Sequence, residues 1–182
     1  MNNVKYKLSL FLFSIISLCV ITVHASAEPL EFLGDYSNVQ SATGEHCEGY
    51  NIMLWKYKGS LVGFLNHHRG LCGDPPMGIL EETLYSASTG SLLFKVKLSD
   101  GCIPQGETCV PTKDRITFKG ALHGEILEGV VSWYSEDMKK SLNSEKIKLS
   151  RDLKRSPDRN YATYDDWIKY WGPILKARGP QW

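Results

Sequence analysis

The chain has 182 residues, of which 21 are Lys or Arg and 20 are Asp or Glu, giving a formal net charge of +1 at pH 7. Such a balance offers no general electrostatic case for binding nucleic acid or a membrane surface. The length fits one domain built around one hydrophobic core.

The first 27 residues have the three parts of a secretory signal peptide. Lys5 and Lys7 form a basic start, the apolar run LSLFLFSIISLCVITV follows, and an Ala-Ser-Ala site occupies positions 25–27. We therefore predict that residues 1–27 are cleaved and that the protein is periplasmic or secreted. The alternative is a membrane anchor, because the apolar run is near the lower length limit for a span. The small-residue site directly after the run favours cleavage.

Cleavage would leave a chain with 19 basic and 20 acidic residues, a net charge of −1. No later segment is long and apolar enough to cross a bilayer, so we expect no membrane span after cleavage. Cys19 would leave with the signal, and Leu18 before it disfavours a lipid-attachment site. An even number of cysteines in an exported chain predicts two disulfides, with three possible pairings. The four remaining cysteines are Cys47, Cys72, Cys102 and Cys109.

Eight strand-like runs follow one another, and no helical periodicity of useful length interrupts them. Six of them form three hairpins, and several alternate apolar and polar residues: Phe94, Val96 and Leu98 face one way. Eight antiparallel strands in sequence favour an all-β, up-and-down barrel, which removes exposed sheet edges. The predicted strands are 31–39, 50–57, 61–68, 79–86, 91–98, 115–122, 125–134 and 144–151.

Tight and long connections alternate along this meander. The turns inside the three hairpins are tight, whereas residues 40–47, 69–77, 99–114 and 135–143 form long connections. Alternate connections of a meander lie at the same end, so all four long loops should share one rim.

The cysteine positions predict which pairs form. If Gly59-Ser60 is a two-residue turn, position 47 lies opposite position 72, so Cys47 and Cys72 can form a disulfide. That bond would contribute roughly 3 kcal/mol on a chain-entropy estimate. Cys102 and Cys109 would close a small ring inside the third long loop. The alternative is a zinc site that uses these cysteines with His46, His67 or His68, which lacks the expected CxxC spacing.

The barrel resembles the lipocalin-like barrels of the calycin group. In that family a Gly-x-Trp in the first strand packs against an arginine after the last strand. Gly34-Asp35-Tyr36 and Arg151 match these positions, with tyrosine in place of tryptophan. The resemblance implies a barrel domain over residues 28–151 in which Tyr36 and Arg151 lie at the end with the tight turns.

Residues 152–182 predict a basic linker and an aromatic helix. Thr163 with Asp166 forms a capping box, and Gly172-Pro173 should end or kink the helix. The helix either docks on the barrel wall or offers an aromatic patch to a partner. Its shared face would consist of Tyr164, Trp167, Ile168 and Trp171.

No catalytic motif is present: the sequence lacks GxSxG, a Gly-rich phosphate loop and HExxH. Oxidised cysteines supply no nucleophile, and His67 and His68 point to opposite faces of a strand. We therefore expect no enzyme activity, no cofactor and no metal.

Two binding functions remain. We favour a rim that binds a protein partner in the cell envelope or outside the cell, in an inhibitor or immunity-type role. The alternative is a carrier of a small apolar ligand. The partner-binding candidates are His67, His68, Arg69, Asp74, Pro75, Pro76, Met77, Glu107 and Lys113.

Bulky inward residues favour the first function, because they predict a filled barrel with no apolar cavity above roughly 300 Å³. The expected inward residues are Leu54, Leu80, Leu84, Phe94, Val96, Leu98, Ile116, Phe118, Val131 and Trp133.

Overall fold

The computed structural model describes residues 29–41, 44–153, 161–180 and 182. The predicted signal peptide and most of the basic linker lie outside these residues. The described part holds eleven strands and one helix, with these bounds: β1 (Glu31–Ser37), β2 (Gln40–Ser41), β3 (His46–Tyr57), β4 (Ser60–Leu71), β5 (Met77–Tyr85), β6 (Ser91–Leu98), β7 (Cys102–Gln105), β8 (Thr108–Pro111), β9 (Asp114–His123), β10 (Ile126–Ser135), β11 (Lys140–Arg151) and α1 (Tyr164–Arg178).

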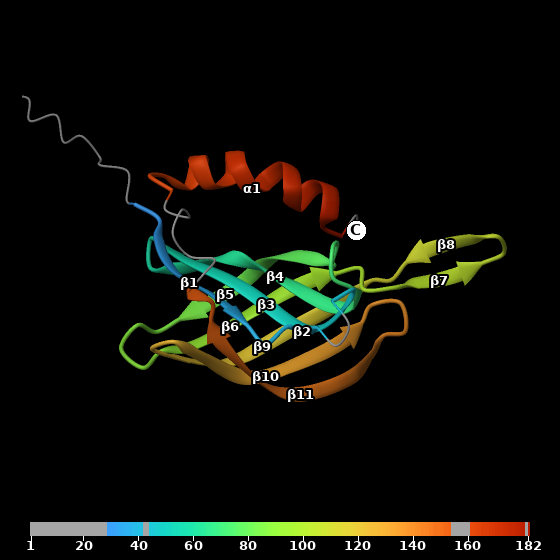
Figure 1. Cartoon of the computed structure of the whole chain (residues 1–182), viewed down its shortest axis with the longest axis horizontal. Coiled ribbons are helices and arrows are strands. Elements are labelled where there is room, and N and C mark those ends of the chain that lie inside the picture. The colour runs from blue at the N-terminus through green and yellow to red at the C-terminus, as the bar shows by residue number, and fades with distance from the viewer. Residues whose placement is uncertain (1–28, 42–43, 154–160, 181) are drawn as a thin grey trace, which may run out of the picture.

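Eight of the strands form a closed antiparallel meander barrel, as predicted. Neighbours pair in the order β1-β11-β10-β9-β6-β5-β4-β3-β2, and β1 also pairs with β3, which closes the ring. Short β2 continues the line of β1 along the edge of β3. Strands β7 and β8 form a separate hairpin that projects from the barrel beside its open end (Figure 1).

The long connections share one end, as predicted, but their contents and bounds differ from the prediction: the first contains β2, and the second shrinks to residues 72–76. The third contains the β7–β8 hairpin, and the fourth shrinks to residues 136–139, because β11 begins at Lys140. A β-bulge between Trp133 and Tyr134 lets β10 and β11 stay paired almost to the rim. In the described residues no helix is long and apolar enough to cross a membrane.

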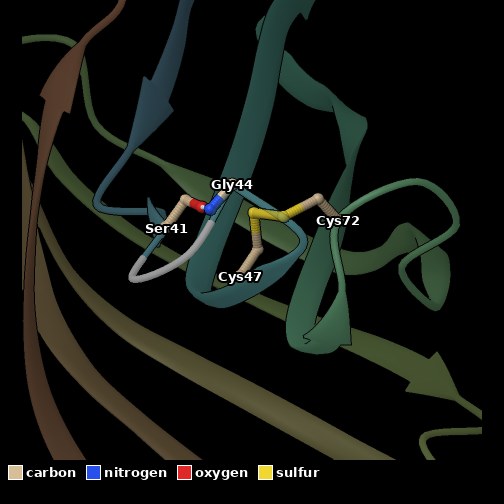
Figure 2. Close-up of a disulfide and its surroundings, with 4 residues drawn as sticks. All are labelled: Ser41, Gly44, Cys47 and Cys72. Carbon is tan, nitrogen blue, oxygen red and sulfur yellow. Dashed lines mark hydrogen bonds between the residues drawn. A yellow bond between two sulfur atoms is a disulfide. The ribbon is translucent and has the colours of Figure 1, made fainter.

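The first hairpin forms the predicted Cys47–Cys72 disulfide in a different register. The turn is Lys58-Gly59, with φ of +50° and +76°, rather than Gly59-Ser60. Cys47 therefore lies opposite Gly70, and the disulfide runs diagonally to Cys72, with a Cα–Cα distance of 4.9 Å (Figure 2). The prediction of the bond is confirmed, and the predicted register is wrong by two residues. Glycine at the second turn position supplies the positive φ that a tight hairpin turn needs.

The barrel interior holds a continuous apolar core. Most of the expected inward residues belong to it, including Phe94 and Phe118, whose rings stack 5.0 Å apart. Leu84 is the exception: a bulge between Glu81 and Leu84 reverses the alternation, so Leu84 is 68% exposed. Tyr85 packs against the core in its place.

The end with the tight turns is closed by the residues that carry the lipocalin resemblance. Tyr36 lies opposite Arg151 in the β1–β11 pair and is 1% exposed. Its hydroxyl donates to the Leu33 carbonyl at 3.0 Å. A Cβ on Gly34, where φ is +154°, would lie 2.7 Å from the Tyr36 ring. Gly34 is therefore needed for the tyrosine to fold back over the core.

Helix α1 docks on the outer wall of the barrel, which was one of the two expectations. Thr163 caps it by accepting from the Asp166 N–H at 3.1 Å. The helix runs on to Arg178 through Pro173, so it does not end at Gly172. Ile168 is 38% exposed and does not belong to the buried face. The wall cluster consists of Leu30, Met53, Trp55, Phe64, Met77, Trp167 and Trp171.

Candidate functional site at the mouth of the barrel

A cavity of about 730 Å³ opens at the loop end of the barrel. We call this cavity the mouth. The predicted bound of roughly 300 Å³ concerned an apolar cavity. The mouth lies above a layer of aromatic side chains at which the apolar core ends, and most of the residues that line it are polar. The mouth therefore does not contradict the prediction of a filled apolar barrel. Four carboxylates line the mouth: Asp100, Asp114, Asp137 and Glu145.

Three aromatic rings form the floor of the mouth. The His67 ring stacks on Tyr50 at a centroid distance of 4.8 Å and meets the edge of Trp133 at 4.8 Å. Trp133 Nε1 donates to the Tyr50 hydroxyl at 3.0 Å. These contacts lock the rings against one another, because each is held by at least two neighbours.

Two carboxylates complete the floor. Asp100 Oδ2 lies 2.9 Å from His67 Nδ1, and the Tyr50 hydroxyl donates to Glu145 Oε1. Burial, followed by the hydrogen bond to Glu145, raises the pKa of Tyr50 far above its ordinary value. Tyr50 therefore stays a neutral phenol and donates to Glu145 throughout the physiological range. This bond connects β3 to β11.

The floor has one feature of a catalytic site and lacks another. His67 and Asp100 make the hydrogen bond of a base and its orienting carboxylate. However, no Ser, Thr or Cys side chain of the described residues makes a hydrogen bond to His67. The four described cysteines are in disulfides, which also removes the thiolates that the zinc alternative needed. A rigid polar floor under an open cavity suits binding.

Exposed apolar side chains stand at the rim of the mouth. Ile103, Met138 and Leu142 are 39%, 55% and 44% exposed, and all three line the cavity. None was predicted as a site residue. Met138 and Leu142 fell in a segment expected to be loop, and Ile103 fell inside the stapled ring. The sequence could have pointed to these residues only through their apolar side chains in segments that were expected to be exposed loops.

The β7–β8 hairpin, residues 102–111, is an arm that stands away from the barrel (Figure 1). The Cys102–Cys109 disulfide, as predicted, ties its two strands at a Cα–Cα distance of 5.4 Å. Ile103 and Val110 lie directly opposite each other across the arm, at 39% and 38% exposure. Every residue of the arm is exposed.

The predicted histidines and arginine are divided between surfaces. His67 lies inside the barrel, with its side chain 12% exposed. Exposed Arg69 lines both the mouth and the adjoining side opening, whereas His68 lines the side opening alone. The mouth therefore gathers His67 and Arg69 from the predicted set.

The predicted proline loop belongs more to the helix than to the rim. The Pro75 carbonyl accepts from Arg178 Nη2 at 3.0 Å, and Pro75 is buried. Met77 is 3% exposed and packs in the wall cluster. The expected apolar contact from Pro75, Pro76 and Met77 is therefore mostly covered by α1.

The remaining predicted residues lie at the rim. The Asp74 side chain is 94% exposed, 3.9 Å from Arg178. Glu107 occupies the tip of the arm and is exposed. The Lys113 backbone N–H donates to Asp137 Oδ2 at 2.8 Å, which ties the base of the arm to the β10–β11 turn.

No family model, curated protein or solved structure matches the chain. A barrel architecture serves many functions, so the function of this chain depends on the chemistry of the mouth and the arm.

Proposed function

We propose that the protein is an exported, lipocalin-like, non-enzymatic barrel whose mouth and arm bind a protein partner in the cell envelope or outside the cell. The observation that carries the proposal is the arm: an exposed hairpin, tied by its own disulfide, that presents Ile103 and Val110 to solvent. The two disulfides suit an oxidising compartment. The pairing of Tyr36 with Arg151 supports the lipocalin-like assignment.

The disulfide of the arm should contribute little to the stability of the barrel. An isolated two-stranded hairpin is marginally stable in water, and this one buries none of its residues on the barrel. A bond that fixes such an element reduces the conformational entropy that is lost when a partner binds. Binding of a partner would then bury the exposed side chains of Ile103 and Val110, which is favourable.

The mouth adds a surface of the composition that interfaces use. Ile103, Met138 and Leu142 supply exposed apolar area at the rim, and charged side chains line the same mouth. Arg115 pairs with Glu136 at 3.1 Å close to the rim. Protein interfaces combine apolar contacts with charged and polar groups, and this combination supports the inhibitor or immunity-type role.

Carriage of a small ligand is the second candidate, and the volume of the mouth favours it. A cavity of about 730 Å³ lies within the usual range of roughly 300–1,000 Å³ for ligand sites. Its lining, however, includes Asp100 and Glu145 at the floor. An apolar ligand would strip water from these carboxylates without replacing their hydrogen bonds. The predicted apolar cargo therefore fits the lining poorly.

The arm can be tested with paired variants. Wild-type protein and an Ile103→Asp, Val110→Asp variant are used as baits in photo-crosslinking from an envelope extract, and the crosslinked partner is then titrated. We expect the arm variant to lose about 2 kcal/mol or more of binding free energy, as interface centres do. A variant of the opposite end, Thr89→Ala with His123→Ala, is the matched control.

Equal affinity of the wild-type protein and the arm variant would overturn the proposal. A small molecule that co-purifies with the wild-type protein in native mass spectrometry would favour the carrier instead. Export is tested by N-terminal sequencing of the mature protein, which should begin at Glu28.

A further inference from the structure

The pairing of β1 with β11 closes the wall of the barrel only near the end with the tight turns. Strand β11 pairs with β1 at Arg151 and Ser150, and further toward the mouth no described strand pairs with β11 on that side. A lateral opening of about 620 Å³ lies there. We call it the seam: Asn38, Gln40 and Ser41 line one side, and Glu145, Lys146 and Ile147 line the other.

The backbone of β11 directs hydrogen-bonding groups into the seam. The Arg151 N–H donates to the Glu125 carbonyl, toward β10, and the Asp152 N–H donates to the Asp35 carbonyl, toward β1. Successive residues of an antiparallel strand alternate between their two neighbours. The N–H and C=O groups of Ser144, Lys146 and Lys148 therefore point away from β10 and into the seam.

We propose that the seam binds an extended, acidic segment of a partner protein as an added strand on β11. An unpaired strand edge is a template for such pairing, in which backbone hydrogen bonds supply the affinity and alternate side chains the specificity. This proposal goes beyond the mouth site, because it concerns the adjoining strand edge and a different mode of recognition.

The positive charges along the edge of β11 favour an acidic segment. Lys146 and Lys148 are exposed on the outer face, whereas Ile147 and Leu149 point into the core. Every second side chain of an added strand would lie beside those lysines, so acidic residues are favoured at these positions. The same lysines disfavour a second copy of this chain. A two-fold pairing centred at position 146 or 147 would place lysine opposite lysine.

The inner face of the seam favours polar side chains on the other positions of the added strand. Glu145 and Tyr50 cross the seam through their hydrogen bond, and the seam shares both residues with the mouth. The disulfide between Cys47 and Cys72 fixes β3 and β4 close to the far side. Ser41 next to it accepts from the Gly44 N–H at 2.8 Å (Figure 2). The side of the seam opposite β11 is thus held in place before any partner arrives.

Hydrogen exchange, read by NMR, tests the geometry and the binding together. In the free protein we expect fast exchange at the amides of Ser144, Lys146 and Lys148 and slow exchange at those of Glu145 and Ile147. The probe is a capped peptide of about eight residues that alternates Glu with Thr. It should slow exchange about tenfold or more at the three outward amides alone. A free protein without this alternation would overturn the proposal.

Two variants of one residue separate backbone pairing from charge. Lys146→Pro removes an outward N–H without breaking the ladder to β10, a position at which edge strands tolerate proline. It should weaken the alternating peptide about tenfold or more, whereas Lys146→Thr should weaken it about threefold or less. Equal affinity of wild type and Lys146→Pro would overturn the proposal.

The matched control is a peptide of the same composition in which the Glu residues are clustered. Equal binding of this peptide would show that the interaction depends on charge alone and would overturn the proposal. Protection that instead grows with protein concentration, without peptide, would identify a second copy as the occupant and overturn the proposal. The peptide experiment uses no captured partner, so its failure leaves the mouth proposal standing.

Discussion

The two ends of the barrel are built from the same strands and each is centred on a tyrosine of the interior, yet they differ in nearly every other respect. At the closed end, Tyr36 satisfies its hydroxyl on a carbonyl three residues away and lies opposite Arg151. At the mouth, Tyr50 reaches across the seam to Glu145. Tyr36 fills the packed end of the core, whereas Tyr50 borders the cavity of the mouth. Removing a side chain from a packed region leaves a larger new cavity, so the closed end should stabilise the barrel more than the mouth does.

The largest effect should follow from removing the closing tyrosine. Tyr36→Ala would leave a cavity in the packed end of the core, and we expect a loss of about 3–5 kcal/mol in the free energy of unfolding. Tyr50→Ala borders an existing cavity and should cost less, about 1–3 kcal/mol. Urea unfolding of both variants measures the difference. Equal losses would contradict the contrast between the two ends.

The two disulfides should differ next. Cys47→Ser with Cys72→Ser opens a crosslink that spans 25 residues, and we expect a loss of roughly 3 kcal/mol in the free energy of unfolding. Cys102→Ser with Cys109→Ser frees only the projecting arm, so its effect on global unfolding should be about 1 kcal/mol or less. Thermal and urea unfolding of the two double variants test this. A larger loss from the arm pair would show that the arm is part of the cooperative unit.

The architecture was predictable because its signals are repeated along the chain. Alternating runs around Gly-containing turns predicted the barrel, and the even number of cysteines predicted two disulfides. The register of the first hairpin was not predictable, since Gly59 serves a turn at positions 58–59 as readily as one at 59–60. Only the positive φ at both Lys58 and Gly59 distinguishes them.

The candidate site was less predictable than the fold, for a physical reason. The floor joins Tyr50, His67, Asp100, Trp133 and Glu145, which lie far apart in sequence and meet only through strand pairing. Met77 looked like a rim residue, because nothing in the sequence shows that α1 packs over the start of β5. The bulge that exposes Leu84 has a similar cause. It depends on Glu82 adopting φ of +47°, which residue type does not favour.

Alkaline pH should weaken the protein through both interior tyrosines. Burial raises the pKa of Tyr36 and of Tyr50, so each stays protonated in the folded state when the unfolded chain begins to ionise near pH 10. Stability is therefore fully present below that pH and falls above it, by up to about 1.4 kcal/mol per pH unit for each tyrosine. Urea unfolding at a series of pH values measures the slope. Tyr50→Phe should have a shallower slope than the wild type, and an unchanged slope would show that Tyr50 does not contribute.

The smallest effect should come from the rim loop beside the mouth. Asp74 is almost fully exposed and lies 3.9 Å from Arg178, so Asp74→Ala should change the free energy of unfolding by about 0.5 kcal/mol or less. Met77→Ala, three residues away, removes a buried side chain from the wall cluster and should cost about 2–5 kcal/mol. The pair therefore separates the surface of the rim from the wall beneath it, and urea unfolding of each variant decides the matter. If Asp74→Ala proved as costly as Met77→Ala, the contact between Asp74 and Arg178 would hold α1 on the barrel, and the rim would contribute to stability as the closed end does.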